Sequence, residues 1–271
     1  MPRRGRLLPR SAVAAPIAAL IVAAPIAALV ASGFSFAAAA TPDPGLRAEV
    51  QFNLCDPVEQ IVRALSLTAD PAQALEIWYF ESPGLEQSAL GVVFRLRLGA
   101  AERILTLKAP ATPDCARLDP ALLPAGQGKC EADMHGESLR DTVSLDTALD
   151  EKTVRELLNG GVALASVLSP AQTRYLQTIA GAWPLAADLR RMGPVRVETL
   201  LPKGGLFVVE AWRLPGGQRF TEASQKTARA DAPRLRAELI ARIDRAGVHL
   251  CSDQSSQSTA KLRILAAGRT P

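Results

Sequence analysis

Hydrophobic and polar residues alternate along several short segments of this chain. The segment 93–98 (VFRLRL) alternates two arginines with phenylalanine and leucines, and the segment 104–108 (ILTLK) alternates Thr and Lys with leucines. A period of two is typical of a β-strand with one apolar face. Together the two predicted strands present one polar, cationic surface, made of Arg95, Arg97, Thr106 and Lys108. Arginine and lysine side chains are the usual ligands of phosphate groups, so this surface suits a polyanion.

The same pattern predicts further strands at 49–54, 77–80, 129–135, 195–200, 206–213 and 220–226. Capping residues and first-turn prolines, followed by apolar residues at helical spacing, predict helices at 58–67, 150–158, 169–181 and 231–246. A short helix is expected after the turn at residues 82–84 and another at 261–265, and the signals from Ser138 to Arg191 are helical. Two groups of strands with helices beside them predict an α+β fold.

The N-terminal segment has the pattern of an export signal. A basic stretch, 2–10, precedes an apolar run over about 13–30, and the small residues 37–40 then offer a cleavage site. An uncleaved membrane anchor is the alternative, because the apolar run is long for a signal peptide. Two prolines within that run, Pro16 and Pro25, favour cleavage.

We therefore predict an exported, periplasmic or secreted protein without a membrane contact after cleavage. The predicted parts are a signal peptide at 1–40, a linker at 41–47 and a single domain at 48–271.

The overall charge does not indicate a nucleic-acid partner. The chain has 31 basic and 27 acidic residues, but four of the basic ones lie among residues 1–40, which hold no acidic residue. The remainder is formally neutral, so its charge gives no reason to expect nucleic-acid binding.

The four cysteines fit an oxidising compartment, because they are even in number and form no C-x-x-C pair. Four cysteines allow three connectivities. We favour Cys115–Cys130, which would close a Pro-rich loop, together with Cys55–Cys251, which would join the start of the domain to its end. A zinc site is the alternative, and the cysteine spacings and the presence of only two histidines disfavour it.

An ordered set of motifs runs from Phe80 to Lys108. After Phe80 come a Ser-Pro turn, a short segment with Leu85 and Leu90, Gly91, the Arg-x-Arg strand and the Thr-x-Lys strand. This order resembles the CYTH, or triphosphate tunnel metalloenzyme, superfamily, which includes thiamine, inorganic and RNA triphosphatases and class IV adenylyl cyclases. The resemblance extends over roughly 49–246 and implies antiparallel strands that close into a tunnel-like barrel, with helices packed outside and charged side chains inside.

The resemblance also implies roles for individual residues. Expected phosphate ligands are Arg95, Arg97 and Lys108, with further charge from Lys129, Arg196 and Lys226. The expected ligands of Mg²⁺ or Mn²⁺ are Glu49, Glu131, Glu198 and Glu222, and the expected catalytic carboxylates are Glu210 and Glu222.

The first predicted strand departs from the family pattern. Where the family has Glu-x-Glu-x-Lys, this chain has Glu49, Gln51 and Asn53. The loss of one carboxylate and one ammonium group should weaken binding of both metal and triphosphate. An alternative role for the interior charges is a structural network in which the glutamates pair with the arginines and lysines.

The sequence therefore supports two alternative functions. The first is an exported protein that binds a triphosphate- or polyphosphate-type polyanion and hydrolyses it as a metal-dependent triphosphatase. The alternative is a non-catalytic exported binding or structural module with a degenerate metal site.

Overall fold

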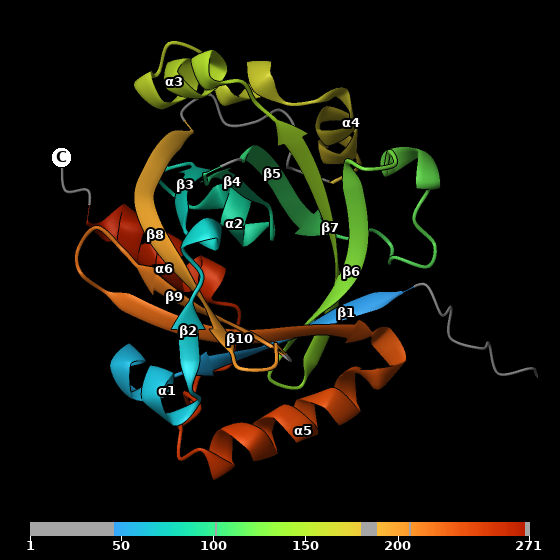
Figure 1. Cartoon of the computed structure of the whole chain (residues 1–271). Helices are drawn as coiled ribbons and strands as arrows, with labels where there is room; N and C mark the ends of the chain where they lie inside the picture. Colours follow the sequence, from blue (N-terminus) through green and yellow to red (C-terminus); the bar gives the residue numbers. More distant parts are fainter. Residues whose placement is uncertain (1–45, 101, 180–188, 206, 269–271) are drawn as a thin grey trace, which may run out of the picture. The chain divides into compact units, whose positions relative to one another are not determined.

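The computed structural model describes residues 46–100, 102–179, 189–205 and 207–268 (Figure 1). The predicted signal peptide and the last two residues of the predicted helix 169–181 lie outside the described residues.

The described chain contains both strands and helices. The strands are β1 (Arg47–Leu54), β2 (Leu67–Ala69), β3 (Leu75–Glu81), β4 (Val93–Leu98), β5 (Arg103–Pro110), β6 (Gly128–His135), β7 (Ser138–Ala148), β8 (Arg190–Pro202), β9 (Val208–Arg213) and β10 (Arg219–Ala228). The helices are α1 (Val58–Ala64), α2 (Glu86–Ala89), α3 (Glu151–Asn159), α4 (Pro170–Thr178), α5 (Ala232–Arg245) and α6 (Gln257–Ala267). Among the described residues, we find no helix with the length and hydropathy needed to cross a membrane.

The sheet closes on itself. Its strand order is β8-β3-β4-β5-β7-β6-β1-β10-β9, and β9 pairs back with β8, while β2 adds to the edge of β8. The described strands thus form a closed nine-stranded barrel, which confirms the predicted α+β barrel with helices outside (Figure 1). One detail differs from the antiparallel prediction, because β1 and β6 run parallel.

Two apolar cores lie between the barrel and its outer helices. One core joins β1, β9 and β10 to α1 and α5, with Phe52 and Leu239 among its buried residues. The other joins β4, β5 and β7 to α3 and α4, with Phe94 and Tyr175 among its residues. Both cores use alternate residues of each strand, so the intervening residues of the same strands face the barrel interior.

The segment Ser138–Ala148 differs from its predicted helical character. It forms β7, the strand that pairs with both β5 and β6. Val143 and Leu145 alternate with inward-facing Ser144 and Asp146, so the period-two pattern was present but was diluted by polar residues on both faces. The helix predicted for 58–67 is also shorter, because Leu67 begins β2.

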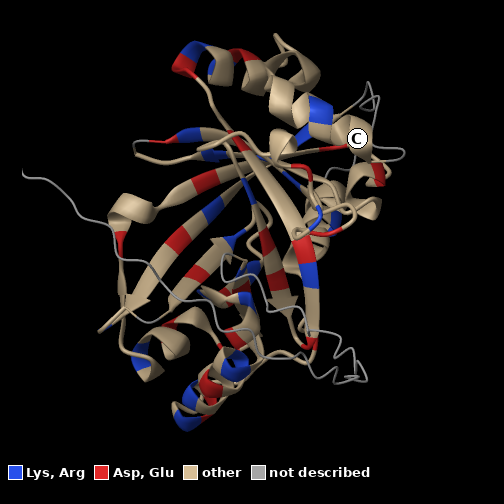
Figure 2. Ribbon diagram, turned by 90° about the vertical axis from the view of Figure 1, so that its right-hand side faces the viewer, with Lys and Arg blue, Asp and Glu red and all other residues tan. Residues whose placement is uncertain are grey.

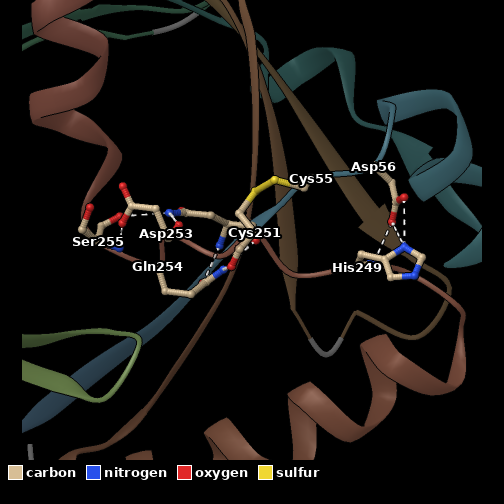
Figure 3. Close-up of a disulfide and its surroundings, with 8 residues drawn as sticks. Cys55, Asp56, His249, Cys251, Asp253, Gln254 and Ser255 are labelled. Carbon is tan, nitrogen blue, oxygen red and sulfur yellow. Dashed lines mark hydrogen bonds and ion pairs between the residues drawn. A yellow bond between two sulfur atoms is a disulfide. The ribbon is translucent and has the colours of Figure 1, made fainter.

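Both preferred disulfides are present. Cys115–Cys130 closes a short loop, and Cys55–Cys251 joins residues 196 positions apart in the sequence. The second disulfide attaches the end of β1 to the segment that precedes α6 (Figure 3). It therefore restrains the C-terminal part of the chain against the first strand.

The long-range disulfide should contribute more to stability than the short one. A cross-link that closes a longer loop removes more entropy from the unfolded chain, so we expect the Cys55→Ser/Cys251→Ser variant to lose ~4–5 kcal/mol of unfolding free energy and the Cys115→Ser/Cys130→Ser variant ~3 kcal/mol. Urea unfolding of the two double variants measures this difference. An equal or smaller loss in the Cys55/Cys251 variant would contradict the expectation.

Candidate functional site

The barrel strands turn one set of side chains toward the outer helices and the other set toward the interior. On β4, Phe94 and Leu96 are fully buried in the outer core together with Tyr175 of α4. Arg95 and Arg97, which alternate with them, therefore face the interior. The charged positions form coloured bands along the barrel strands in Figure 2.

The interior and its rim carry both signs of charge. The cationic side chains are Arg95, Arg97, Lys108, Lys129, Lys226 and Lys261. The acidic side chains are Glu49, Glu131, Asp133, Asp146, Glu210 and Glu222. Within the described part of the chain, these acidic and basic side chains largely compensate each other.

Three acidic side chains meet at one side of the interior, and we call Glu49, Glu131 and Asp133 the acidic corner. Each offers a carboxylate oxygen, and these oxygens all lie within 4.8 Å of one another. The parallel pairing of β1 with β6 brings them together, because it sets Glu49 opposite Asp133. Glu131 and Asp133 are buried. Clustered carboxylates are the ligands that Mg²⁺ and similar hard cations prefer, so the donor set fits such an ion.

Lysines from three strands compensate the acidic corner. Lys108 Nζ lies 2.5 Å from Asp133 Oδ2, and Lys129 Nζ lies 2.5 Å from Glu131 Oε1. Lys226 Nζ approaches the other oxygen of Glu131 to 3.6 Å. Burial acts against the charged form of Lys226, but Glu49 and Glu131 outweigh it and raise its pKa. The corner is therefore held by ammonium groups, which a metal ion would have to replace.

Two further contacts hold Asp133 in place. Thr142 donates its hydroxyl to Asp133 Oδ2 at 3.0 Å, and the Gln51 amide nitrogen lies 3.5 Å from Asp133 Oδ1. Gln51 occupies a position where the family pattern has a carboxylate. Its amide thus supports the corner as a donor and adds no negative charge.

A cationic wall, formed by Arg95, Arg97 and Lys108, lies on β4 and β5. Arg97 lies 3.4 Å from Asp146, which also accepts a hydrogen bond of 2.5 Å from the hydroxyl of Thr106. The buried Nε atoms of both Arg95 and Arg97 have no hydrogen-bond partner among the described residues. The wall therefore keeps donors that an anionic ligand can accept.

A second group of charges surrounds Lys261. Glu210 and Glu222 are directly opposite each other on β9 and β10. Burial, together with the nearby charge of Glu222, raises the pKa of Glu210 to about 7. Burial lowers the pKa of Lys261 to about 8, against the attraction of the two glutamates. Lys261 Nζ lies 3.3 Å from the centre of the Trp212 ring, a cation–π contact.

Lys261 reaches this position because α6 packs on the interior side of the sheet. Leu262 and Leu265 of α6 share a buried cluster with Ile77, Tyr79 and residues of β8 and β9. Tyr79 is the cross-strand partner of Arg95, and therefore lies on the same, inward face. The C-terminal helix thus covers part of the barrel interior.

Asn53 anchors the segment that leads into α6. Its side-chain amide donates to the backbone oxygens of Asp253 and Ser255, each at 2.9 Å. Its backbone N–H donates to the Gln254 side chain, which donates in return to the Asn53 carbonyl. The disulfide between Cys55 and Cys251 lies next to these contacts (Figure 3). Asn53 therefore has a structural contact at the position where the family pattern has a lysine.

The structure brings most of the predicted site residues together. Those that face the interior or its rim are Arg95, Arg97, Lys108, Lys129, Lys226, Glu49, Glu131, Glu210 and Glu222. Arg196 and Glu198 are not with them. They alternate on β8 with Val195 and Val197, which are buried on the inward face, so both charged side chains lie on the exposed outer face.

Sequence reasoning missed three interior charges. Asp133 shares the inward parity of Glu131, and this signal was sufficient to place it beside the corner. Asp146 was missed because β7 was assigned helical character. No strand pattern could predict Lys261, because it lies on a helix and reaches the interior only through the packing of α6.

Comparison with known proteins supports the fold and goes no further. No family model and no curated protein matches the sequence. Among solved structures, HpAC1 from Hippeastrum, an assigned adenylyl cyclase with a dominant triphosphatase activity, matches 82% of this chain and 96% of its own at 16% identity and a TM-score of 0.53. An assigned adenylate cyclase from Bacillus halodurans matches 79% of this chain and 96% of its own at 12% identity and a TM-score of 0.52. The chain has a CYTH-like fold, which confirms the resemblance at the level of architecture.

The raised pKa of Glu210 predicts a pH dependence of stability. Between its usual value of 4.5 and about 7, the folded protein keeps a proton that the unfolded chain releases. The stability that the protonated Glu210 contributes is therefore fully present below pH 4.5, and it is lost as the pH rises through about 7. We expect Glu210→Gln to lose less stability than the wild type between pH 5 and pH 7.5, as measured by urea unfolding.

Glu238→Gln, at an exposed site on α5, is the matched control and should decline as the wild type does. A decline in Glu210→Gln as steep as in the wild type would show that Glu210 titrates normally.

Proposed function

We propose that the barrel interior binds a triphosphate- or polyphosphate-type polyanion together with a divalent cation, Mg²⁺ or Mn²⁺. The observation that carries the proposal is the acidic corner, whose carboxylate oxygens lie within 4.8 Å of one another, next to a wall of arginines and Lys108. Metal–phosphate complexes need carboxylates for the metal and guanidinium or ammonium groups for the phosphate. The interior supplies both, with β7 between the strands of the wall (β4 and β5) and those of the corner (β6 and β1).

The ion pair between Lys108 and Asp133 connects the two halves of this site. Lys108 is the only member of the cationic wall that contacts the corner within the described residues. A divalent cation held by Glu49, Glu131 and Asp133 would take over the charge compensation of Asp133. Lys108 would then be released to contact a phosphate oxygen beside Arg95 and Arg97. Cation and polyanion should therefore bind cooperatively.

We propose hydrolysis of a phosphoanhydride bond as the activity of this site. The bound metal would neutralise phosphate charge and act as a Lewis acid. Arg95 and Arg97 would orient the phosphate chain through their unpartnered Nε–H groups. Glu210 faces Glu222, and burial together with the nearby charge of Glu222 raises the pKa of Glu210 to about 7. In its ionised form Glu210 would accept the proton of the attacking water.

A non-catalytic binding module is the second candidate, and specific observations favour it. Lysines already compensate the acidic corner, and Gln51 and Asn53 remove a carboxylate and an ammonium group from β1. Such a network would compensate the carboxylates of the corner without a metal. In that case the cationic wall would bind an anion and release it unchanged.

We also propose that the protein is exported, to the periplasm or the medium. The support is the pattern of residues 1–40 and the pairing of all four cysteines in disulfides, which persist in oxidising compartments. A free triphosphate or polyphosphate small molecule, with no nucleic acid, is the partner we expect there.

Phosphate release from tripolyphosphate tests the activity directly. We expect turnover with Mg²⁺ or Mn²⁺ and none with EDTA. Asp133→Asn should lower turnover by at least ~10–100-fold, since even supporting groups around a metal have effects of this size. Glu238→Gln, an exposed acidic control on α5, should retain wild-type turnover. Metal-independent turnover, or full activity in Asp133→Asn, would contradict the assignment of the corner.

Ligand-dependent thermal stabilisation separates the two candidates. A ligand that binds only the folded state raises the melting temperature by mass action. We expect tripolyphosphate to stabilise the wild type and Arg155→Gln, an exposed control on α3, and to stabilise Arg95→Gln much less. Stabilisation without turnover would identify the binding module. An unchanged shift in Arg95→Gln would place the anion elsewhere.

A further inference from the structure

Three arginines form a row across the outer face of the barrel. Arg196 on β8 is the cross-strand partner of Arg213 on β9, and Arg213 is the partner of Arg219 on β10. All three residues are exposed. Their neighbours Val197 and Trp212 belong to the inward-facing buried cluster, so the arginine row points away from the interior. Arg196, a member of this row, was predicted from the sequence to belong to the interior site.

The row has more positive charge than its surroundings neutralise. Like charges directly opposite each other on neighbouring strands destabilise a sheet. Arg219 pairs with Glu59 at 3.0 Å, but neither Arg196 nor Arg213 forms an ion pair with any residue that the structure describes. Glu76, the other cross-strand neighbour of Arg196, instead accepts a hydrogen bond of 2.8 Å from Trp78. Arg213 therefore has an arginine on either side and no carboxylate partner.

The arginine row lines a small cavity of about 120 Å³. This volume is well above the ~10–15 Å³ that a single water molecule requires. Its lining includes the whole row together with Val58, Glu198 and Thr221. Guanidinium forks are groups that bind an oxyanion.

We infer that this cavity is a second anion site, on the outside of the barrel, for a single phosphate group or a phosphate monoester. The one acidic residue in its lining, Glu198, and the pairing of Arg219 with Glu59 limit the net positive charge. Those charges suit a small mono- or dianion rather than a polyphosphate chain. The site uses no residue of the interior, so it stands whether or not the interior hydrolyses phosphoanhydrides.

Titration with inorganic phosphate, followed by calorimetry, tests the site. We expect Arg213→Gln and Arg196→Gln each to weaken phosphate binding by about tenfold, since each removes a charge-assisted contact. Arg155→Gln, an exposed arginine on α3, lowers the net charge equally and should leave binding unchanged. Arg95→Gln, inside the barrel, should leave this binding event in place. The substitutions at the exposed positions Arg155, Arg196 and Arg213 should leave the protein folded.

Two outcomes would overturn the inference. One is wild-type phosphate affinity in the Arg196→Gln/Arg213→Gln double variant, and the other is an equal loss in Arg155→Gln. Co-sedimentation with phosphatidic acid vesicles, using phosphatidylcholine vesicles as the blank, distinguishes the sources of the phosphate group. Vesicle binding that Arg213→Gln abolishes identifies a lipid headgroup, whereas phosphate binding without vesicle binding identifies a free phosphate. Binding of neither probe refutes the site.

Discussion

The pairing of β8 with β9 closes the sheet, and this closure determines what every inward-facing side chain must contact. An open sheet could expose its polar face to bulk water. In a closed barrel the same alternation directs charged residues into a confined interior, where an unpaired charge is costly. The presence of both acidic and basic side chains in the interior follows from this constraint. The carboxylates of the acidic corner therefore form ion pairs with Lys108, Lys129 and Lys226.

This pairing of opposite charges affects how a ligand can bind. A metal ion alone, or a polyanion alone, would leave unbalanced charge inside the barrel. In the proposed complex the two together would disturb the balance less, because the cation would replace lysine at Asp133 and the polyanion would take up the released ammonium group of Lys108. On this proposal, the ion-paired network and the ligand-binding site would be two states of one set of charges.

The sequence predicted those parts of the fold and site that depend on local periodicity. Alternation placed Arg95, Arg97 and Lys108 on one face, and parity placed Glu131 with Lys129. Parity also assigned Arg196 to a polar face, but it could not tell which face was inside, because that depends on where the sheet closes. The parallel pairing of β1 with β6 and the packing of α6 depend on contacts between residues far apart in the chain. Local patterns contain no information about either.

The altered first strand illustrates how such long-range contacts change the meaning of a motif. Taken alone, Asn53 in place of a lysine removes a cation from the barrel. In the structure, the Asn53 amide binds the segment 253–255, and this segment begins the turn into α6. That helix carries Lys261 to the glutamates of β9 and β10. A short neutral amide makes these contacts to backbone oxygens, whereas a long ammonium side chain at the same position would project past them. The residue that removes one interior cation therefore holds in place the segment that supplies another.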